Sequence, residues 1–339
     1  MKPVHCFALV VFVVCLSGGL VETAMSTPVH NDFNTDDTSD LLLYNTLTGD
    51  TGVGVINAGA LQSNNQILAA DPTAGWILSA SGDFDADGIS DFLFYNTTTG
   101  ELRVVLLDIL ALESDTVVIT LPPASGLVPQ GVGDIDGDGD SDILLFNSTT
   151  GEVVGLEMNG GTVADSGPIT NVAVGDNWIF LHTGDFDGDG KTDLFLFNTV
   201  SGAMSFVPLN GLIPSAEVGL FNLDLAAGWT IDDVEDFNND GNADLLMLNT
   251  IEGTLAVTLQ DGAGNIVAGG SVLTIDVING WTAANAGEYN GDGNMDVLLF
   301  NTVTGGVYIL MLERTVPLGF LPVVQKDVAA GEIVHSGKP

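Results

Sequence analysis

One acidic loop recurs six times along this chain at a nearly constant spacing. Its first acid falls at positions 32, 83, 134, 185, 236 and 288, so successive loops start 51 or 52 residues apart. A fixed period of this length indicates a repeat architecture, in which each unit is one supersecondary element that buries its apolar surface against the next. The chain is therefore expected to fold as six similar units.

Each unit contains the same parts in the same order. The acidic loop runs into an apolar segment such as 92–95, then into a turn of the form Asn-Thr-x-Thr-Gly such as 96–100. Two further runs rich in β-branched residues and leucine, such as 104–107 and 117–120, complete the unit. Short apolar runs of about five residues separated by turn signals predict strands, and four per unit of about 50 residues are typical of a propeller blade. The predicted fold is all-β, a six-bladed β-propeller of four-stranded blades.

The two ends of the chain predict how the ring closes. Seven residues before the first acid stand Trp76, Leu127, Trp178, Trp229 and Trp281, but the first unit has no such strand before it. The segment 329–339 aligns with 226–236 and places Glu332 at the tryptophan position. We therefore expect the ring to be closed by pairing of the N- and C-terminal strands, within one domain over 25–339.

The first 24 residues have the pattern of a secretory signal peptide. Lys2 is followed by an apolar run over 7–16, which is too short to span a bilayer, and then by small residues. Both cysteines, Cys6 and Cys15, lie in this segment, and Val14 before Cys15 disfavours lipid attachment. The sequence predicts a secreted or periplasmic protein without disulfides, and no later stretch predicts a transmembrane segment.

The charge balance excludes several partners. The 339 residues hold 45 Asp and Glu against 6 Lys and Arg, which gives a formal net charge of −39. Nucleic-acid binding requires clustered basic residues that displace counterions from phosphates, so this function is excluded. Because 45% of the residues are hydrophobic, the chain still has ample material for a core.

The acidic loops have the composition of a calcium site. Side-chain oxygens at positions 1, 3, 5 and 9 and a main-chain carbonyl from position 7 converge when the chain turns at a glycine in position 6. Such a set of oxygen ligands suits Ca²⁺, which turns the repulsion between carboxylates into attraction. The sequence predicts up to six Ca²⁺ ions. Positions 1, 3, 5, 7 and 9 of the six loops are Asp32, Asn34, Asp36, Thr38 and Asp40; Asp83, Asp85, Asp87, Ile89 and Asp91; Asp134, Asp136, Asp138, Asp140 and Asp142; Asp185, Asp187, Asp189, Lys191 and Asp193; Asp236, Asn238, Asp240, Asn242 and Asp244; and Glu288, Asn290, Asp292, Asn294 and Asp296.

The six loops differ in how many carboxylates they carry and in whether position 6 is glycine. Loops 2, 3 and 4 have four side-chain carboxylates each, whereas loop 5 has an asparagine at position 3. Loop 1 has Asp37 in place of the glycine, and loop 6 begins with Glu288, so we expect these two to bind most weakly. An EF-hand is excluded because position 12 of loop 4 is Leu196, within a predicted strand, where an EF-hand requires a carboxylate.

The loop, its spacing and the frame "GW…GDF…NTxTG" resemble FG-GAP/VCBS-type repeats, which also build the integrin α-subunit propeller. The resemblance covers about residues 26–339 and implies a calcium-bearing, often extracellular propeller with roles in adhesion or carbohydrate recognition. The chain lacks a Gly-Ala-Pro tripeptide and has six units where integrins have seven. Integrin ligand specificity is therefore not carried over.

Other repeated residues admit two interpretations each. The tryptophans could stack on sugars, but Leu127 at the equivalent place favours packing between blades. Asn96 and Asn147 satisfy the N-glycosylation pattern, but the same asparagine recurs in units without it, which favours a role in the turn.

For function, the sequence favours a binding or adhesion module for an extracellular glycan or protein ligand. Only three histidines and two arginines lie beyond the signal segment, at unrelated repeat positions, so no catalytic constellation can be assembled. Two alternatives stay open: an extracellular enzyme acting on polysaccharides, and a structural repeat in a larger surface assembly.

Overall fold

The structure is a computed structural model that describes residues 31–335. The predicted signal peptide, both cysteines and His30 lie outside the described residues. Six four-stranded antiparallel sheets form the blades, numbered here by repeat. From the inside of the ring outward, their strands are β26 (Glu332–Val334), β1 (Leu41–Asn45), β2 (Asp50–Asn57) and β3 (Ala60–Ala69) in blade 1; β4 (Trp76–Gly82), β5 (Asp91–Asn96), β6 (Glu101–Asp108) and β7 (Ala111–Thr120) in blade 2; and β8 (Val128–Gly133), β9 (Asp142–Phe146), β10 (Glu152–Asn159) and β11 (Thr162–Asn171) in blade 3.

The other three blades follow the same order. Their strands are β12 (Trp178–Gly184), β13 (Asp193–Asn198), β14 (Ala203–Val207) and β17 (Val218–Asn222) in blade 4; β18 (Trp229–Glu235), β19 (Asp244–Asn249), β20 (Thr254–Gln260) and β21 (Ile266–Thr274) in blade 5; and β22 (Trp281–Gly287), β23 (Asp296–Asn301), β24 (Gly306–Glu313) and β25 (Val316–Gln325) in blade 6.

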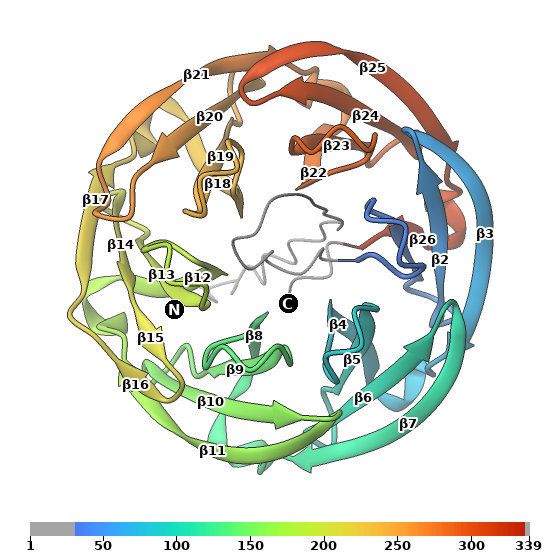
Figure 1. The fold of residues 1–339 in the computed structure, drawn as a ribbon, viewed down its shortest axis with the longest axis vertical. Helices are drawn as coiled ribbons and strands as arrows, with labels where there is room; N and C mark the ends of the chain where they lie inside the picture. Colours follow the sequence, from blue (N-terminus) through green and yellow to red (C-terminus); the bar gives the residue numbers. More distant parts are fainter. Residues whose placement is uncertain (1–30, 336–339) are drawn as a thin grey trace, which may run out of the picture.

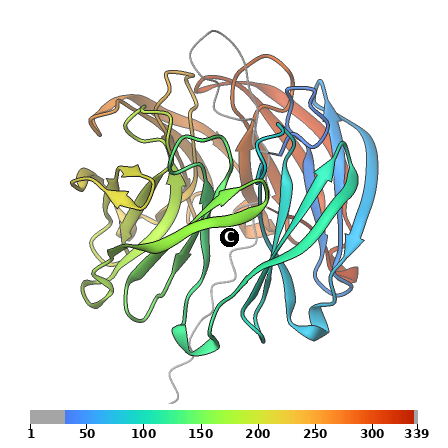
Figure 2. The same cartoon turned by 60° about the horizontal axis from the view of Figure 1, so that its bottom comes forward.

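The blades are arranged as a closed ring around a central axis. Figure 1 shows the first strand of each blade nearest the centre and the fourth strand on the outer rim. Figure 2 shows the blades standing side by side around the ring. The predicted all-β, six-bladed propeller is confirmed.

The ring closes as the sequence predicts. Strand β26 pairs antiparallel with β1, and Glu332 lies opposite Asn45. Trp76 lies opposite Asn96 in the same register, so Glu332 does occupy the tryptophan position. The last strand of the described chain thus supplies the innermost strand of the first blade.

Because neighbouring strands of a blade are antiparallel, the connections between strands lie on two opposite faces of the ring. In blades 2 to 6 the acidic loop joins the first strand to the second, and in blade 1 it leads into β1, the second strand. These loops lie on the same face of the ring as the hairpins between the third and fourth strands. The opposite face carries the asparagine turns and six short 3-10 turns that link successive blades. These are η1 (Pro72–Ala74), η2 (Pro123–Ser125), η3 (Val174–Asp176), η4 (Leu225–Ala227), η5 (Val277–Asn279) and η6 (Val328–Ala330).

The asparagine turns have a structural role. Asn96 is buried; its side-chain oxygen accepts hydrogen bonds from the amides of Thr98 and Thr99, and its Nδ2 donates to the carbonyl of Ala74. Asn147 is also buried, and its Nδ2 donates to the carbonyl of Ser125. Both amides are therefore engaged, which confirms the turn interpretation of these two positions.

Hydrophobic cores fill the spaces between neighbouring blades. Residues 41–44 of strand β1 are all buried and divide between two cores, so both faces of this strand are covered. Trp76 packs partly buried against one of these cores, and Trp178, Trp229 and Trp281 pack likewise in their own blades. Packing is therefore confirmed as the role of the tryptophans.

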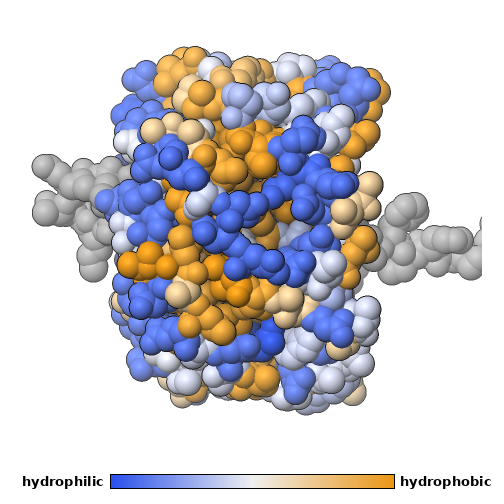
Figure 3. Space-filling model, turned by 90° about the vertical axis from the view of Figure 1, so that its right-hand side faces the viewer, coloured by the Kyte–Doolittle hydropathy of each residue, from blue (hydrophilic) through white to orange (hydrophobic). Residues whose placement is uncertain are grey.

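The rim departs from the sequence prediction in two respects. The third and fourth strands commonly reach 8 to 10 residues instead of about five, because their hairpins extend past the body of the blade. Blade 4 instead has a small ribbon between its third and fourth strands, formed by β15 (Leu209–Asn210) and β16 (Ile213–Pro214). Figure 3 shows one side of the rim, where hydrophobic and hydrophilic side chains lie in alternating patches.

Candidate metal-binding loops

All six acidic loops share one backbone conformation. The residues at positions 4 and 6 both have a positive φ, as in Gly188 (74°) and Gly190 (84°) of loop 4. Position 6 was expected to require glycine, but the turn at position 4 was not foreseen because its residue varies between loops. Loop 1 has two residues with side chains in this left-handed region, Thr35 at 60° and Asp37 at 61°. The side chains at these positions carry a steric cost that glycine avoids.

The carboxylate at position 1 organises the loop around itself. In loop 4, one oxygen of Asp185 accepts from the amides of Gly188 at 2.7 Å and Asp189 at 3.2 Å, and the other accepts from Gly190 at 2.8 Å. The carboxylate at position 5 accepts from the amide at position 7 in the same way, as Asp189 does from Lys191 at 3.0 Å. The main chain therefore wraps around the acids and holds their side chains toward the inside of the loop.

The carboxylate at position 9 is buried in every loop and connects three elements. In loop 2, Asp91 begins strand β5, and its oxygens accept from the amide of Phe84 at 2.9 Å and from the amide of Leu107, in β6, at 2.8 Å. The same pair of hydrogen bonds recurs at Asp40, Asp142, Asp193, Asp244 and Asp296. Position 9 therefore joins the loop to the third strand of its blade.

Burial makes these acids difficult to ionise. Desolvation raises the pKa of Asp91 to about 8, and the position-9 acid of each other loop has a pKa raised to about 8 by the same cause. At position 1, desolvation raises the pKa of Asp83 and of Asp185 to about 6. A cation bound among these groups would offset both the desolvation and the mutual repulsion of the carboxylates.

Three loops bring their carboxylates to a common point. In loop 2, oxygens of Asp83, Asp85 and Asp91 lie within 4.8 Å of one another. Positions 1, 3 and 9 also converge in loop 3, through Asp134, Asp136 and Asp142, and in loop 4, through Asp185, Asp187 and Asp193. Each set could hold a metal ion, and oxygen donors of this kind fit Ca²⁺.

In loop 2, the acid at position 5 also meets a residue from outside the loop. Asp87 meets Asp85 in a second group, which Glu113 of strand β7 completes within the same 4.8 Å limit. Glu113 lies on an outer strand, away from the loop in sequence, and no repeated pattern marked it. The side chains at position 7 differ widely, from the buried Ile89 to Lys191, which fits a position where only the main chain was expected to contribute.

In loops 5 and 6, the asparagine at position 3 donates a hydrogen bond to the acid at position 9. In loop 6, Asn290 Nδ2 donates to Asp296 at 2.9 Å, and in loop 5, Asn238 Nδ2 donates to Asp244 at 3.3 Å. An amide N–H thus reaches the buried carboxylate that a cation would otherwise contact. These loops, with loop 1, have a weaker donor set than loops 2 to 4.

Hydrogen bonds connect neighbouring loops into a belt. In loops 1 to 5, the amide at position 8 donates to the carbonyl of position 1 in the preceding loop, as Ser90 does to Asp32 at 2.9 Å. Thr192 donates to Asp134 at 2.7 Å in the same way, and Ser39 donates to Glu288 at 2.9 Å where the ring closes. Loops 5 and 6 are instead joined by Asn239, whose Nδ2 donates to the carbonyl of Gly293. The position of each loop is therefore coupled by hydrogen bonds to the position of its neighbour.

Comparison with known families agrees with this geometry. A profile of the FG-GAP-like repeat matches residues 134–196 and 236–299, which begin at the first acids of loops 3 and 5. These two regions of the chain carry FG-GAP-like repeats. The remaining units share the loop and strand pattern described above. No curated protein sequence matches the chain.

Solved structures with a similar fold share little sequence with these FG-GAP-like repeats. One chain of a nidogen/laminin complex has 10% identity and a TM-score of 0.50, with 88% of this chain and 99% of that chain covered. A chain of the Photorhabdus luminescens Tc holotoxin pore has 13% identity and a TM-score of 0.49, with 83% of this chain covered. This chain spans only 15% of the length of that toxin chain. Among residues 31–335, no helix is long and apolar enough to cross a membrane.

Proposed function

We propose that this protein is an exported, calcium-stabilised β-propeller that binds an extracellular glycan or surface protein. The observation that carries the calcium part is the convergence of three carboxylates from positions 1, 3 and 9 in loops 2, 3 and 4. Each loop also buries the acid at position 9, where desolvation makes ionisation costly unless a cation is bound. Carboxylates about 4 Å apart repel by roughly 4 kcal/mol at an effective dielectric constant of 20, and a divalent cation removes this cost.

In this proposal the ions have a structural role. In blades 2 to 6 each loop joins the first and second strands, and hydrogen bonds connect it to the neighbouring loop. A cation held by Asp83, Asp85 and Asp91 would fix the start of β5 against the end of β4. It would lie among buried protein donors, which is the arrangement of a structural site and not of an open catalytic one.

Export is supported by the predicted signal peptide. Extracellular fluids hold Ca²⁺ at concentrations that fill weak oxygen-donor sites. An ion concentration 100-fold above the dissociation constant stabilises the folded state by about 2.7 kcal/mol per site. The proposed location and the proposed ion therefore agree with each other.

The test is a pair of measurements on the chain from Met25 onward. The melting temperature is recorded in Ca²⁺ and in EDTA, and a glycan array is probed under both conditions. We expect a higher melting temperature in Ca²⁺ and a glycan signal that EDTA abolishes. An unchanged melting temperature would contradict the calcium part, and a blank array with folded protein would contradict glycan binding and favour a protein ligand.

A further inference from the structure

A pocket of about 180 Å³ opens between blade 6 and blade 1, where the ring closes. Its walls come from β1, β2, β3 and β26 and from the segment that follows β25. The register places Leu43, Gly52 and Gln66 on one face of the blade 1 sheet. Leu43 belongs to the core shared with blade 6, so this face is the one turned toward blade 6.

The pocket lies where blade 1 lacks two large side chains that occupy the equivalent positions of blades 2 and 6. In blade 2, the Arg103 guanidinium lies 4.6 Å from the ring centre of Trp76. In blade 6, the rings of Trp281 and Tyr308 meet edge to face at 5.4 Å. Blade 1 has Glu332 at the tryptophan position and Gly52 at the position of Arg103 and Tyr308.

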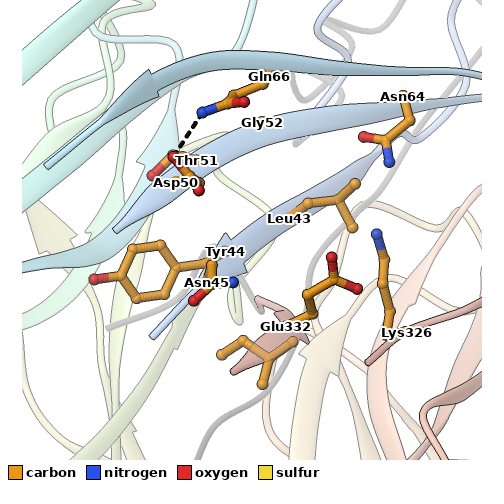
Figure 4. Close-up of a pocket in the computed structure, with 11 residues that line it drawn as sticks. Leu43, Tyr44, Asn45, Asp50, Thr51, Gly52, Asn64, Gln66, Lys326 and Glu332 are labelled. Carbon is orange, nitrogen blue, oxygen red and sulfur yellow. Dashed lines mark hydrogen bonds between the residues drawn. The ribbon is translucent and has the colours of Figure 1, made fainter. Parts of the chain in front are cut away.

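A third departure from the repeat places a lysine in the same pocket. The amide of Lys326 donates to the carbonyl of Gly305, and the equivalent bond in the other blades is made by buried apolar residues. These residues are Ala70, Leu121, Val172, Leu223 and Ile275. Lys326 is only 8% exposed, and its side chain lines the pocket (Figure 4). No ion pair or hydrogen bond joins its Nζ to another side chain among residues 31–335.

The remaining lining groups present acceptors and donors together. Asp50 accepts from Gln66 Nε2 at 2.6 Å, as Figure 4 shows. The Glu332 carboxylate accepts from the amide of Asp327 at 2.9 Å and keeps further acceptor capacity toward the pocket. Burial lowers the pKa of Lys326, and the neighbouring Glu332 opposes this shift. One cation and two carboxylates give the pocket a net negative charge, which disfavours anionic ligands.

We propose that this pocket binds a neutral, hydroxyl-rich ligand of the size of a single sugar ring. Adjacent hydroxyl groups both donate and accept hydrogen bonds, so they can pair with Lys326 and Glu332 at once. The volume lies below the range of about 300–1,000 Å³ that is usual for drug-sized ligands, which fits one ring and not an oligosaccharide. This inference rests on the proposed function, because it names the glycan-binding site of the propeller.

The experiment titrates neutral monosaccharides into the Ca²⁺-loaded protein by ligand-observed NMR, beside the glycan array. We expect saturable binding with a dissociation constant on the order of 1 mM for the preferred sugar. The double variant K326I/E332W restores the residues that other blades carry and fills the pocket. It is expected to stay folded and to weaken binding at least tenfold.

Matched single variants give a control within the same molecule. Asp50→Asn is expected to weaken sugar binding about fivefold, because a charged acceptor is lost. Glu101→Gln changes the equivalent position in blade 2, where Trp76 and Arg103 occupy the space, and is expected to leave binding unchanged. Equal effects of these two variants would overturn the pocket assignment.

The monosaccharide titration and the glycan array together distinguish failure of the pocket assignment from failure of the proposed function. An array signal that K326I/E332W retains overturns the pocket and leaves the glycan-binding function standing. Monosaccharide binding that K326I/E332W loses, together with a blank array, supports the pocket and overturns glycan recognition as the function of the propeller. Tighter binding of a zwitterionic amino acid than of any sugar overturns the hydroxyl assignment.

Discussion

Glu332 lies opposite Asn45 in the same register in which Trp76 lies opposite Asn96 in the next blade. A strand from the C-terminal end therefore reproduces, residue for residue, a pairing that the other blades make within one repeat. His335 continues this pairing, because its amide donates to the carbonyl of Leu42 at 2.7 Å. The fold of blade 1 depends on both ends of the described chain.

Deletion of residues 332–339 should open the ring. The deletion removes the innermost strand of blade 1 and with it the buried Val334, and it leaves one edge of β1 unpaired. Burial of the lost side chains predicts destabilisation of at least about 3 kcal/mol, and the free edge predicts aggregation. Chemical denaturation and light scattering measure both effects. Deletion of 336–339 alone keeps β26 and serves as the control, and equal behaviour of the two deletions would refute closure by β26.

The acid at position 9 should stabilise the blade with or without a cation. In Asp91→Asn, one carboxylate oxygen that accepts from a buried amide is replaced by an NH₂ group, which cannot accept. An unsatisfied buried amide costs about 1–3 kcal/mol, so the variant should lose this much stability even in EDTA. Asp87→Asn, at the exposed position 5, should lose much less stability in EDTA. A loss at Asp91 seen only in the presence of Ca²⁺ would show that the position acts solely as a metal ligand.

The period of 51 residues was sufficient to predict the six blades, because every unit repeats the same apolar runs and turns. The closing strand was also predictable, since Glu332 aligns with the tryptophans. The contact of Glu113 with Asp85 and Asp87 could not be predicted, because only tertiary packing brings this outer strand to the loop. The pocket beside Lys326 was equally hidden, since it arises where three unremarkable substitutions meet in space. The repeat pattern predicts the features that all units share, whereas the Glu113 contact and the Lys326 pocket depend on residues that differ between units.

Loops 2, 3 and 4 should account for most of the calcium stabilisation. The triple variant D85N/D136N/D187N gives these loops the asparagine that loops 1, 5 and 6 carry at position 3. Each site then loses one of its three converging carboxylates, so the rise in melting temperature caused by Ca²⁺ should fall by more than half. Isothermal titration should show three strong sites in the parent and none in the variant. The triple variant N34D/N238D/N290D is the converse, and a rise in the number of strong sites is expected.

Asp37→Gly should stabilise loop 1. Asp37 has a φ of 61°, whereas five loops have glycine at this position, and glycine adopts such angles without a steric cost. Relief of this cost, offset in part by the greater freedom of glycine in the unfolded chain, predicts a gain of about 0.5 kcal/mol or more. The opposite change Gly88→Ala, in loop 2, adds a Cβ that meets no other atom within 4 Å and adds no charge, so its expected loss of about 1 kcal/mol isolates the backbone effect. Denaturant titration of both variants in EDTA tests the pair, and changes of the same sign would reject a conformational cause.

His335 should make the protein less stable in mild acid. Burial lowers the pKa of its imidazole from 6.5 to about 4, and the ring lies edge to face with Tyr44 at 6.2 Å. Between these two pH values the unfolded chain binds a proton that the folded chain excludes, so the free energy of unfolding falls as the pH falls through this window. The full difference is about 3 kcal/mol, because each pKa unit corresponds to about 1.4 kcal/mol. His335→Gln cannot take up this proton, so the difference in stability between parent and variant should change with pH from 6.5 to 4 and stay constant above 7. A difference that does not vary over the acidic range would show that the imidazole is already protonated in the fold.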